Sequence, residues 1–260
     1  MDSVNKTLYI PLYGKAYVSS RGLFLRDEKA EQIWAEEGFP LKGKAKSKWL
    51  AFYMGIRAAV FDDWLRLQLE TAEDATVIHL GCGLDSRVHR VGSQCGMWYD
   101  VDFEEVIQER RRYDGNSECY RMLPGDAREC SWLEEIPATK RGIVVMEGVS
   151  MYLTTEQLQS LLNALCEKFE RLNVLMDCYS TLAAKASKYK NPVHDLGVTQ
   201  VYGLDDPERL QQGSLVFEKE HSMTPQRYIC QLRGMEKFIF SKLYAGSLSR
   251  KLYRLYEFRS

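Results

Sequence analysis

The chain has 260 residues, a length that suits one large domain with a substantial buried core. Hydrophobic residues make up 45% and charged residues 27% of it, an ordinary globular composition that excludes a disordered or collagen-like chain. The net charge of −1 excludes the basic excess that is typical of nucleic-acid-binding proteins.

Cysteine usage and the absence of long apolar runs indicate the compartment. The seven cysteines form no C-x-x-C pair and have no histidine cluster beside them, so we expect neither a disulfide framework nor a metal site. Residues 1–14 lack a cationic stretch followed by an apolar run, and no segment approaches the ~20 apolar residues of a membrane span. We expect a cytoplasmic protein with no membrane or nucleic-acid partner, and the sequence indicates no oligomeric state.

The first third of the chain is predicted to be helical. Residues 27–36 form a short helical pattern. Residues 45–69 repeat apolar side chains at intervals of three and four, which predicts a long amphipathic helix.

From residue 75 onward, short apolar runs alternate with helical patterns. Thr154 and Gln157 form a capping-box signature at the start of one of these helices. The predicted strands are 75–80, 97–101, 118–123, 143–146 and 173–179, and the predicted helices are 103–113 and 154–169. This alternation predicts an α/β layered fold with a doubly wound, mainly parallel sheet.

After residue 180 the alternation stops. Residues 181–212 read as a helical insertion, with a second helix starting near 205–207, and two further strands are predicted at 215–221 and 252–258. A closing pair of strands that can run antiparallel is typical of the methyltransferase variant of the doubly wound sheet. We expect a single domain over 1–260, made of a helical N-terminal extension (1–70), a cofactor-binding core (71–180), a cap insertion (181–212) and closing strands (213–260).

The sharpest local feature is a glycine loop directly after the first predicted strand. Gly81 and Gly83 allow a tight turn and let a ligand approach bare main chain. Asp102 follows the second strand, where an acid can accept both hydroxyls of a ribose. Asp126 and Glu147 follow the third and fourth strands. A glycine pair alone fits a plain turn, but glycines and acids at the ends of four successive strands favour one nucleoside ligand at the sheet edge.

Two observations favour S-adenosylmethionine over a dinucleotide. The third glycine of a dinucleotide fingerprint is replaced by Ser86, and carboxylates would repel a pyrophosphate but suit a sulfonium cation. Arg57, in the long helix, can clamp a carboxylate, or can instead pair with Asp62 or Asp63 on a solvated face. An NAD(P)-dependent oxidoreductase and a non-catalytic nucleoside-binding protein stay open as alternatives.

Several motifs resemble the leucine carboxyl methyltransferase family, and within it the tetracenomycin polyketide O-methyltransferase-like branch. The resemblance covers nearly the whole chain and implies a seven-stranded class I S-adenosylmethionine-dependent methyltransferase fold with its last strand antiparallel. It also implies O-methylation of a small-molecule carboxylate or hydroxyl, polyketide-like or another secondary metabolite. The motifs that carry it are residues 7–16, 81–87, 99–103, 147–153 and 202–207.

The resemblance also implies roles for single residues around S-adenosylmethionine. It implies that Arg57, with Lys15 as a helper, binds the methionine carboxylate. The remaining positions that it implies are Gly81 and Gly83 against the methionine backbone, Asp102 on the ribose, Asp126 and Ala127 near the adenine, and Glu147 close to the donor. Lys15 and Ser86 depart mildly from the residues that are common there, arginine and threonine.

The acceptor side is less clear from the sequence. A carboxylate acceptor is already ionised near neutral pH, whereas a phenol with a pKa near ~10 needs help to lose its proton. We expect His79 to be a buried core residue, His89 to lie on a helix surface and His221 to have no evident partner, so no base stands out and a carboxylate is slightly favoured. Candidates to orient the acceptor are Tyr152, Tyr179 and His194. The run 110–112 of arginines is expected on a solvated helix face.

Overall fold

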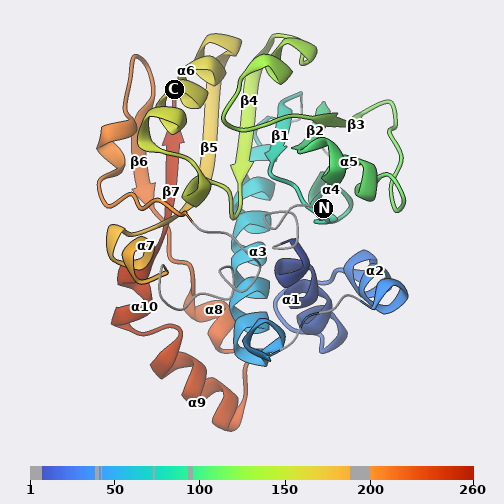
Figure 1. The fold of residues 1–260 in the computed structure, drawn as a ribbon, viewed down its shortest axis with the longest axis vertical. Coiled ribbons are helices and arrows are strands. Elements are labelled where there is room, and N and C mark those ends of the chain that lie inside the picture. The colour runs from blue at the N-terminus through green and yellow to red at the C-terminus, as the bar shows by residue number, and fades with distance from the viewer. Residues whose placement is uncertain (1–7, 39–40, 42, 73, 93–95, 188–199) are drawn as a thin grey trace.

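A seven-stranded sheet forms the centre of the molecule (Figure 1). The structure, a computed structural model, describes residues 8–38, 41, 43–72, 74–92, 96–187 and 200–260. The strands are β1 (Thr76–Leu80), β2 (Met97–Asp102), β3 (Tyr120–Pro124), β4 (Thr139–Met146), β5 (Phe169–Tyr179), β6 (Val216–Glu220) and β7 (Tyr253–Arg259).

The strand order is β3-β2-β1-β4-β5-β7-β6. Strands β1 to β5 pair in parallel, whereas β7 runs antiparallel between β5 and β6. The predicted doubly wound sheet with an antiparallel last strand is therefore confirmed. The order reverses between β1 and β4, and in such sheets ligands bind beyond the carboxyl ends of the strands at the reversal.

Helices cover both faces of the sheet and extend below it in the view of Figure 1. The α-helices are α1 (Tyr9–Ser20), α2 (Glu28–Glu37), α3 (Lys48–Leu69), α4 (Arg87–Val91), α5 (Glu104–Arg110), α6 (Thr155–Lys168), α7 (Thr181–Ser187), α8 (Gln226–Ile229), α9 (Gly234–Leu243) and α10 (Ser247–Leu252). Short 3₁₀ helices are η2 (Gly43–Lys46), η4 (Ser131–Glu135), η5 (Ser150–Tyr152) and η7 (Pro207–Leu210).

Alternate residues of the buried strands feed two hydrophobic cores, as the two-residue period of a strand requires. Ile143 and Val145 of β4 pack in the same core as the apolar face of α3. Val144 and Met146 of the same strand point to the opposite face, where they share a core with the leucines of α6. The continuous apolar runs in the sequence arise because both faces of these strands are covered.

Helix α1 lies against α3 at two glycines. A Cβ on Gly14 would lie 2.6 Å from Met54 Cβ, and a Cβ on Gly55 would lie 2.6 Å from Val18 Cγ2. The two helix backbones therefore approach more closely than larger residues would allow. This contact fixes α1, which carries Lys15, beside α3, which carries Arg57.

Some elements differ from the sequence prediction. The helix expected over 103–113 ends at Arg110, and the helix expected near 205–207 is only the four-residue 3₁₀ helix η7. Helices α1, α8, α9 and α10 were not predicted. The capping box of Thr154 and Gln157 is confirmed at the start of α6.

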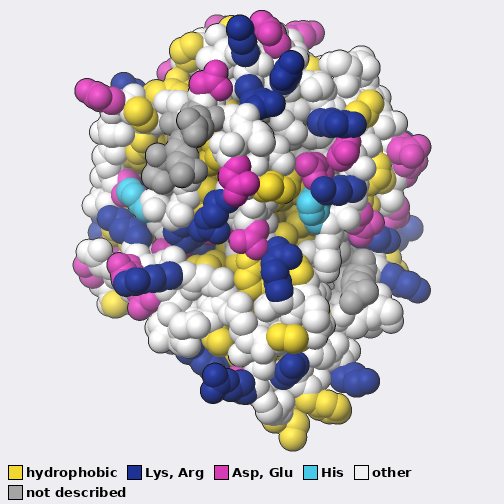
Figure 2. Space-filling model, turned by 180° about the vertical axis from the view of Figure 1, so that it is seen from behind, with side chains coloured by type: hydrophobic (Ala, Val, Ile, Leu, Met, Phe, Trp, Pro, Cys, Tyr) yellow, Lys and Arg dark blue, Asp and Glu magenta, His cyan; other side chains and the backbone are white. Residues whose placement is uncertain are grey.

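The face of the molecule that Figure 2 shows offers no large field of one sign among the described residues. Acidic and basic side chains are interspersed over the face drawn in Figure 2, in line with the net charge of −1. Within the part of the chain that the structure describes, no helix combines the length and apolar character that crossing a bilayer requires.

Candidate functional site

A cavity of about 1190 Å³ lies at the carboxyl ends of the parallel strands. Its wall includes residues at or just after the ends of β1, β2, β3 and β4, together with side chains from α1, α3, α7 and β7. Single ligand sites usually enclose about 300–1000 Å³. The cavity therefore has room for a donor and an acceptor side by side.

The glycine loop forms part of the cavity wall with bare main chain. Gly81 and Gly83 have φ angles of 67° and 53°, in the left-handed region that favours glycine. The Gly81 N–H donates to the carbonyl of Val101 at 2.7 Å, which fixes the loop on the end of β2. A Cβ on Gly81 would lie 2.1 Å from Val149 Cγ2, so packing as well as backbone conformation requires glycine there.

Asp102 stands at the end of β2 and faces the glycine loop. Its Oδ2 accepts a hydrogen bond from the Gly83 N–H and its Oδ1 accepts one from the Phe103 N–H, both at 2.8 Å. Burial raises the pKa of Asp102 to about 6, against the lowering effect of these two backbone N–H groups. A carboxylate has about four lone-pair sites, so Asp102 retains capacity for further donors.

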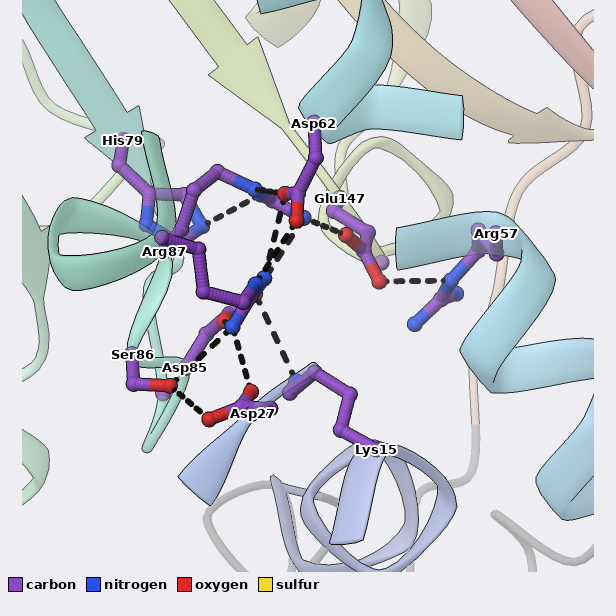
Figure 3. Close-up of polar contacts among 12 residues, drawn as sticks. Lys15, Asp27, Arg57, Asp62, His79, Asp85, Ser86, Arg87 and Glu147 are labelled. Atoms are coloured by element: carbon purple, nitrogen blue, oxygen red, sulfur yellow. Dashed lines mark hydrogen bonds and ion pairs between the residues drawn. The ribbon is translucent and has the colours of Figure 1, made fainter. Parts of the chain in front are cut away.

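Arg57 reaches the cavity from α3 and is held by acids, as Figure 3 shows for its contact with Glu147. Its Nε donates to Glu147 Oε1 at 2.9 Å, and its Nη1 donates to Asp177 Oδ2 at 3.1 Å and to Tyr253 Oη at 2.8 Å. Burial alone would lower the pKa of Arg57, but Tyr253, Glu147 and Asp177 raise it well above its ordinary value. Its guanidinium is therefore a fixed positive charge in the cavity wall.

The alternative prediction, in which Arg57 pairs with Asp62 or Asp63, is wrong. Asp62 accepts hydrogen bonds from Arg87 at 2.8 Å and from Arg90 at 2.7 Å. Asp63 instead contacts Arg227 at 2.8 Å, outside the cavity wall. Arg57 faces away from both acids because its side of α3 turns toward β4 and β5.

Arg87 is the centre of a buried ionic network beside the cavity (Figure 3). This side chain is fully buried and contacts Asp62, Glu147 and, at 3.3 Å, Asp85. Lys15 is also buried and pairs with Asp85 at 3.5 Å. Glu147 thus joins Arg57 and Arg87, and the network links the glycine loop to α1 and α3.

His79 and His221 have structural surroundings. His79 is buried between Asp100 at 3.2 Å and Arg87 at 3.1 Å, and burial lowers its pKa, which confirms its expected core role. The prediction that His221 has no partner is wrong, because its Nε2 lies 2.6 Å from Glu257 Oε2 of β7. His194 lies outside the described residues.

Arg110 does not lie on a solvated face as expected. It is buried, pairs with Asp100, donates to Tyr120 Oη at 3.0 Å and donates to the carbonyl of Gly83 at 3.1 Å. Asp100 and Tyr120 lie on β2 and β3, and α5 packs on both strands with the Arg110 side turned inward. Arg110 therefore supports the glycine loop from behind.

The predicted adenine-side and acceptor-side residues line the same cavity. Asp126 and Ala127 lie in the loop after β3, and Tyr152 and Tyr179 lie in η5 and at the end of β5. The Asp126 carboxylate accepts 2.9 Å hydrogen bonds from the main-chain N–H and the guanidinium of Arg128. Although burial raises the pKa of Asp126, these bonds lower it below its ordinary value.

Two residues of the site were missed in the sequence. Asp177 is fully buried at the end of β5, and Tyr253, at the start of β7, lines the cavity. Asp177 is an acid near the carboxyl end of a parallel strand, as Asp102 and Glu147 are, but it lies two residues before the last residue of β5. A search for acids near strand ends, and not only at or after them, would have found it, whereas Tyr253 carries no such signal.

Comparison with known proteins identifies relatives of this chain. The sequence profile described as "Leucine carboxyl methyltransferase" matches residues 12–166. The tetracenomycin polyketide synthesis O-methyltransferase TcmP of Streptomyces glaucescens is 29% identical over 186 residues, which are 70% of this chain and 69% of that protein. The S-adenosyl-L-methionine-dependent methyltransferase dpfgK of Gibberella zeae is 26% identical over 234 residues, 81% of this chain and 78% of that protein.

Solved structures share the fold. The magnesium protoporphyrin IX methyltransferase of Synechocystis PCC 6803 superposes with a TM-score of 0.53 at 13% identity, over 98% of this chain and 99% of that one. The geranyl diphosphate C-methyltransferase of Streptomyces coelicolor A3(2) gives 0.51 at 16% identity, over 86% and 84%. These likenesses show the class I methyltransferase fold. With a profile match over more than half of its length, the chain belongs to the leucine carboxyl methyltransferase family.

Proposed function

We propose that the protein is an S-adenosylmethionine-dependent O-methyltransferase that methylates a carboxylate or hydroxyl of a small molecule. Membership of a methyltransferase family and the names of the two relatives support the reaction class. The observation that carries the proposal is the cavity at the reversal of strand order. The wall of this cavity contains the main chain of Gly81 and Gly83. It also contains the Asp102 carboxylate, which can accept further hydrogen bonds, and the guanidinium of Arg57.

The residues in the cavity wall fit this donor in their chemistry. Arg57 would bind the methionine carboxylate through Nη2, for which no hydrogen bond is found among the described residues, with Lys15 as a nearby second cation. Asp102 would accept the ribose hydroxyls, and Glu147 would lie close to the cationic part of the donor. Asp126 and Ala127 would border the adenine.

When bound, this donor supplies a methyl carbon that its sulfonium group has already activated. The chain then has to hold both reactants in line and exclude water. Ala183 and Ala186 of α7 line the same cavity, and so does Tyr202. We infer that the described residues of the 181–212 cap cover the acceptor, and that the chain works as one cytoplasmic unit of N-terminal helices, cofactor-binding core, cap and closing strands.

A dinucleotide fits the same site poorly. Ser86, at the place of the third glycine, is buried, and its hydroxyl donates to Asp27. The acids Asp102, Asp126 and Glu147 would lie near any pyrophosphate held by the loop. These contacts favour a sulfonium nucleoside over NAD(P), and family membership favours an enzyme over a non-catalytic nucleoside-binding protein.

A transfer assay with a methyl-labelled donor tests the proposal. The protein is incubated with the donor and a mixed extract of low-molecular-mass metabolites, and the products are then separated by mass. We expect label in a small organic product that is extracted away from the donor. Label that stays entirely in the donor, or that enters only protein, would contradict the proposed function.

A further inference from the structure

A buried arginine behind the glycine loop contacts the residue that holds Asp102. Arg110 comes from α5, and only 2% of its surface is exposed. Its Nη1 donates a hydrogen bond to the Gly83 carbonyl at 3.1 Å. The N–H of the same glycine donates to Asp102 Oδ2 at 2.8 Å. Arg110 and the Asp102 carboxylate therefore hold the two polar groups of one glycine.

These two contacts fix the peptide groups on either side of the Gly83 Cα. The N–H belongs to the peptide group before this Cα, and the carbonyl belongs to the one after it. Gly83 has a φ of 53°, and a glycine adopts other φ values at little steric cost. A rotation of either peptide group would break one of the two hydrogen bonds. The orientation of the Asp102 carboxylate is therefore coupled to the position of Arg110.

Arg110 is itself fixed by groups of β2 and β3. Its Nη2 pairs with Asp100, and its Nε donates to Tyr120 Oη at 3.0 Å. Tyr120 Oη in turn donates to Asp100 Oδ2 at 2.7 Å, and Trp98 Nε1 donates to Asp100 Oδ1 at 2.8 Å. The guanidinium thus joins two strands to the glycine loop, and it cannot move without breaking several of these contacts.

The geometry of β2 also brings the charge of Arg110 to Asp102. Asp100 and Asp102 are two residues apart on this strand, so their side chains leave the same face of the sheet. Burial raises the pKa of Asp102 to about 6, and Asp100 adds to this because like charges disfavour ionisation. Arg110 opposes the rise, as do the N–H groups of Gly83 and Phe103.

The other titratable groups near Asp102 do not replace this cation. Burial raises the pKa of the Cys82 thiol, in the glycine loop, well above its ordinary value, so the thiol is uncharged near neutral pH. In the cavity wall, Arg128 is already paired with Asp126, and Glu105 has the same sign of charge as Asp102. Loss of the Arg110 charge would therefore leave the ionised form of Asp102 less stable.

We propose that Arg110 is a positioning residue for the methyl donor, which holds the Gly83 peptide and keeps Asp102 charged and oriented for the ribose hydroxyls at neutral pH. This inference rests on the proposed function, because it needs a ribose that donates to Asp102. Arg110 acts through Gly83 and Asp102 and does not touch the donor. Its removal should therefore change the pH range of donor binding, which a purely structural role would leave unchanged.

The test measures the affinity of the full chain for S-adenosylhomocysteine by calorimetry, at pH values on both sides of the Asp102 pKa of about 6. Arg110→Gln removes the charge, whereas Arg110→Lys keeps the charge but replaces the planar fork by a single donor atom. Arg90→Gln is the control, because Arg90 is a buried arginine that pairs with Asp27 and Asp62 and lies outside the cavity wall. Urea unfolding gives the stability of each protein.

In Arg110→Gln we expect the midpoint of the affinity curve to move up by about one pH unit, because a nearby opposite charge lowers the pKa of a carboxyl group by at least this much. In Arg110→Lys the midpoint should stay near that of the wild type. Its affinity should instead fall about two- to tenfold at every pH, as expected for one lost hydrogen bond. Arg90→Gln should lose stability but keep the wild-type midpoint.

A further pair of variants covers the case in which Arg110→Gln does not fold, because Asp100 is left buried without its counter-charge. Asp100→Asn removes a like charge and should move the midpoint down. Adding Arg110→Gln to Asp100→Asn should then move it up again, and the effect of Arg110 is measured between these two proteins.

Three results would overturn the inference. The first is a midpoint that is the same with and without the Arg110 charge, in folded protein that binds S-adenosylhomocysteine. The second is an equal shift of the midpoint in Arg90→Gln. The third is an affinity that is unchanged in Arg110→Lys. Failure of the wild-type protein to bind S-adenosylhomocysteine would instead contradict the proposed function itself, so the two failures are distinguishable.

Discussion

At the scale of single residues, the proposed role of Asp102 in donor binding predicts that donor affinity depends on pH. Burial raises its pKa from 3.8 to about 6, so its ionised form predominates only above that pH. Because the ribose hydroxyls would donate to the carboxylate, we expect affinity for S-adenosylhomocysteine to be constant between pH 7 and 8. Below about pH 6 it should approach a tenfold loss per pH unit, the limit where only one protonation state binds.

The stability of the free protein should change in the opposite direction. A raised pKa means that the folded chain keeps a proton on Asp102 that the unfolded chain has already released. The stabilisation from this group is therefore complete below pH 3.8 and is lost as pH rises through about 6. Urea unfolding of wild type and Asp102→Asn across this pH range checks the stability prediction, and calorimetric titration with S-adenosylhomocysteine over the same range checks the affinity prediction. A pH step in affinity that persists in Asp102→Asn would assign it to another group.

Arg87 should be the most costly side chain of the ionic network to remove. Replacing it by methionine leaves Asp62, Asp85 and Glu147 buried with fewer counter-charges, and breaking a buried pair usually costs about 3–5 kcal/mol. Arg26 pairs with Glu28 on the surface with 84% of its side chain exposed, so Arg26→Met should cost less than about 1 kcal/mol. Urea unfolding of both variants measures the difference, and equal losses would contradict the role of the network.

Single residues also show where prediction from the sequence stopped. Asp102, Asp126 and Glu147 were found because an acid that follows a parallel strand can be located from the position of the strand end alone. The burial of Arg87 and Arg110 depends on partners from other elements, which only the folded chain brings together.

At the scale of elements, the glycine loop gives a matched comparison. Gly81 and Gly22 have similar φ angles of 67° and 63°, but a Cβ would meet Val149 at Gly81 and nothing within 4 Å at Gly22. In both Gly→Ala variants, backbone strain should lower the free energy of unfolding by about 1 kcal/mol. Only Gly81→Ala should lose more stability than this. It should also lose donor affinity, because the loop must shift away from Val149.

Thermal unfolding and S-adenosylhomocysteine titration of the two variants measure these effects. Reducing the crowding with Val149→Ala in the Gly81→Ala background should restore part of the stability. Equal behaviour of Gly81→Ala and Gly22→Ala would show that the loop tolerates a side chain.

The predictability of the elements follows from how each one buries its surface. Strands β1, β2, β4 and β5 were predicted because their central residues are buried and read as apolar runs, although β4 and β5 extend further than those runs. Helix α1 was missed because its buried residues, among them Lys15 and Gly14, follow no apolar stripe. Helix α9 was missed because Met235 and Phe238 are exposed and obscure its pattern.

At the scale of the whole molecule, the fold places residues from distant parts of the chain around one cavity. Lys15 and Arg57 come from the N-terminal helices, Asp102 and Glu147 from the sheet edge, and Tyr253 from the last strand. The sequence predicted the architecture and the acids at the strand ends that line the cavity, because these depend on local patterns. The arrangement of the acceptor side depends on β7 and the helices before it, where the patterns were weakest.

The central claim is that this cavity binds a sulfonium nucleoside and not a dinucleotide. Calorimetric titration of the wild-type protein with S-adenosylhomocysteine and, separately, with NAD tests it most directly. The account predicts saturable binding of S-adenosylhomocysteine at one site per chain and no measurable heat of binding for NAD. Saturable binding of NAD together with no binding of S-adenosylhomocysteine would contradict it.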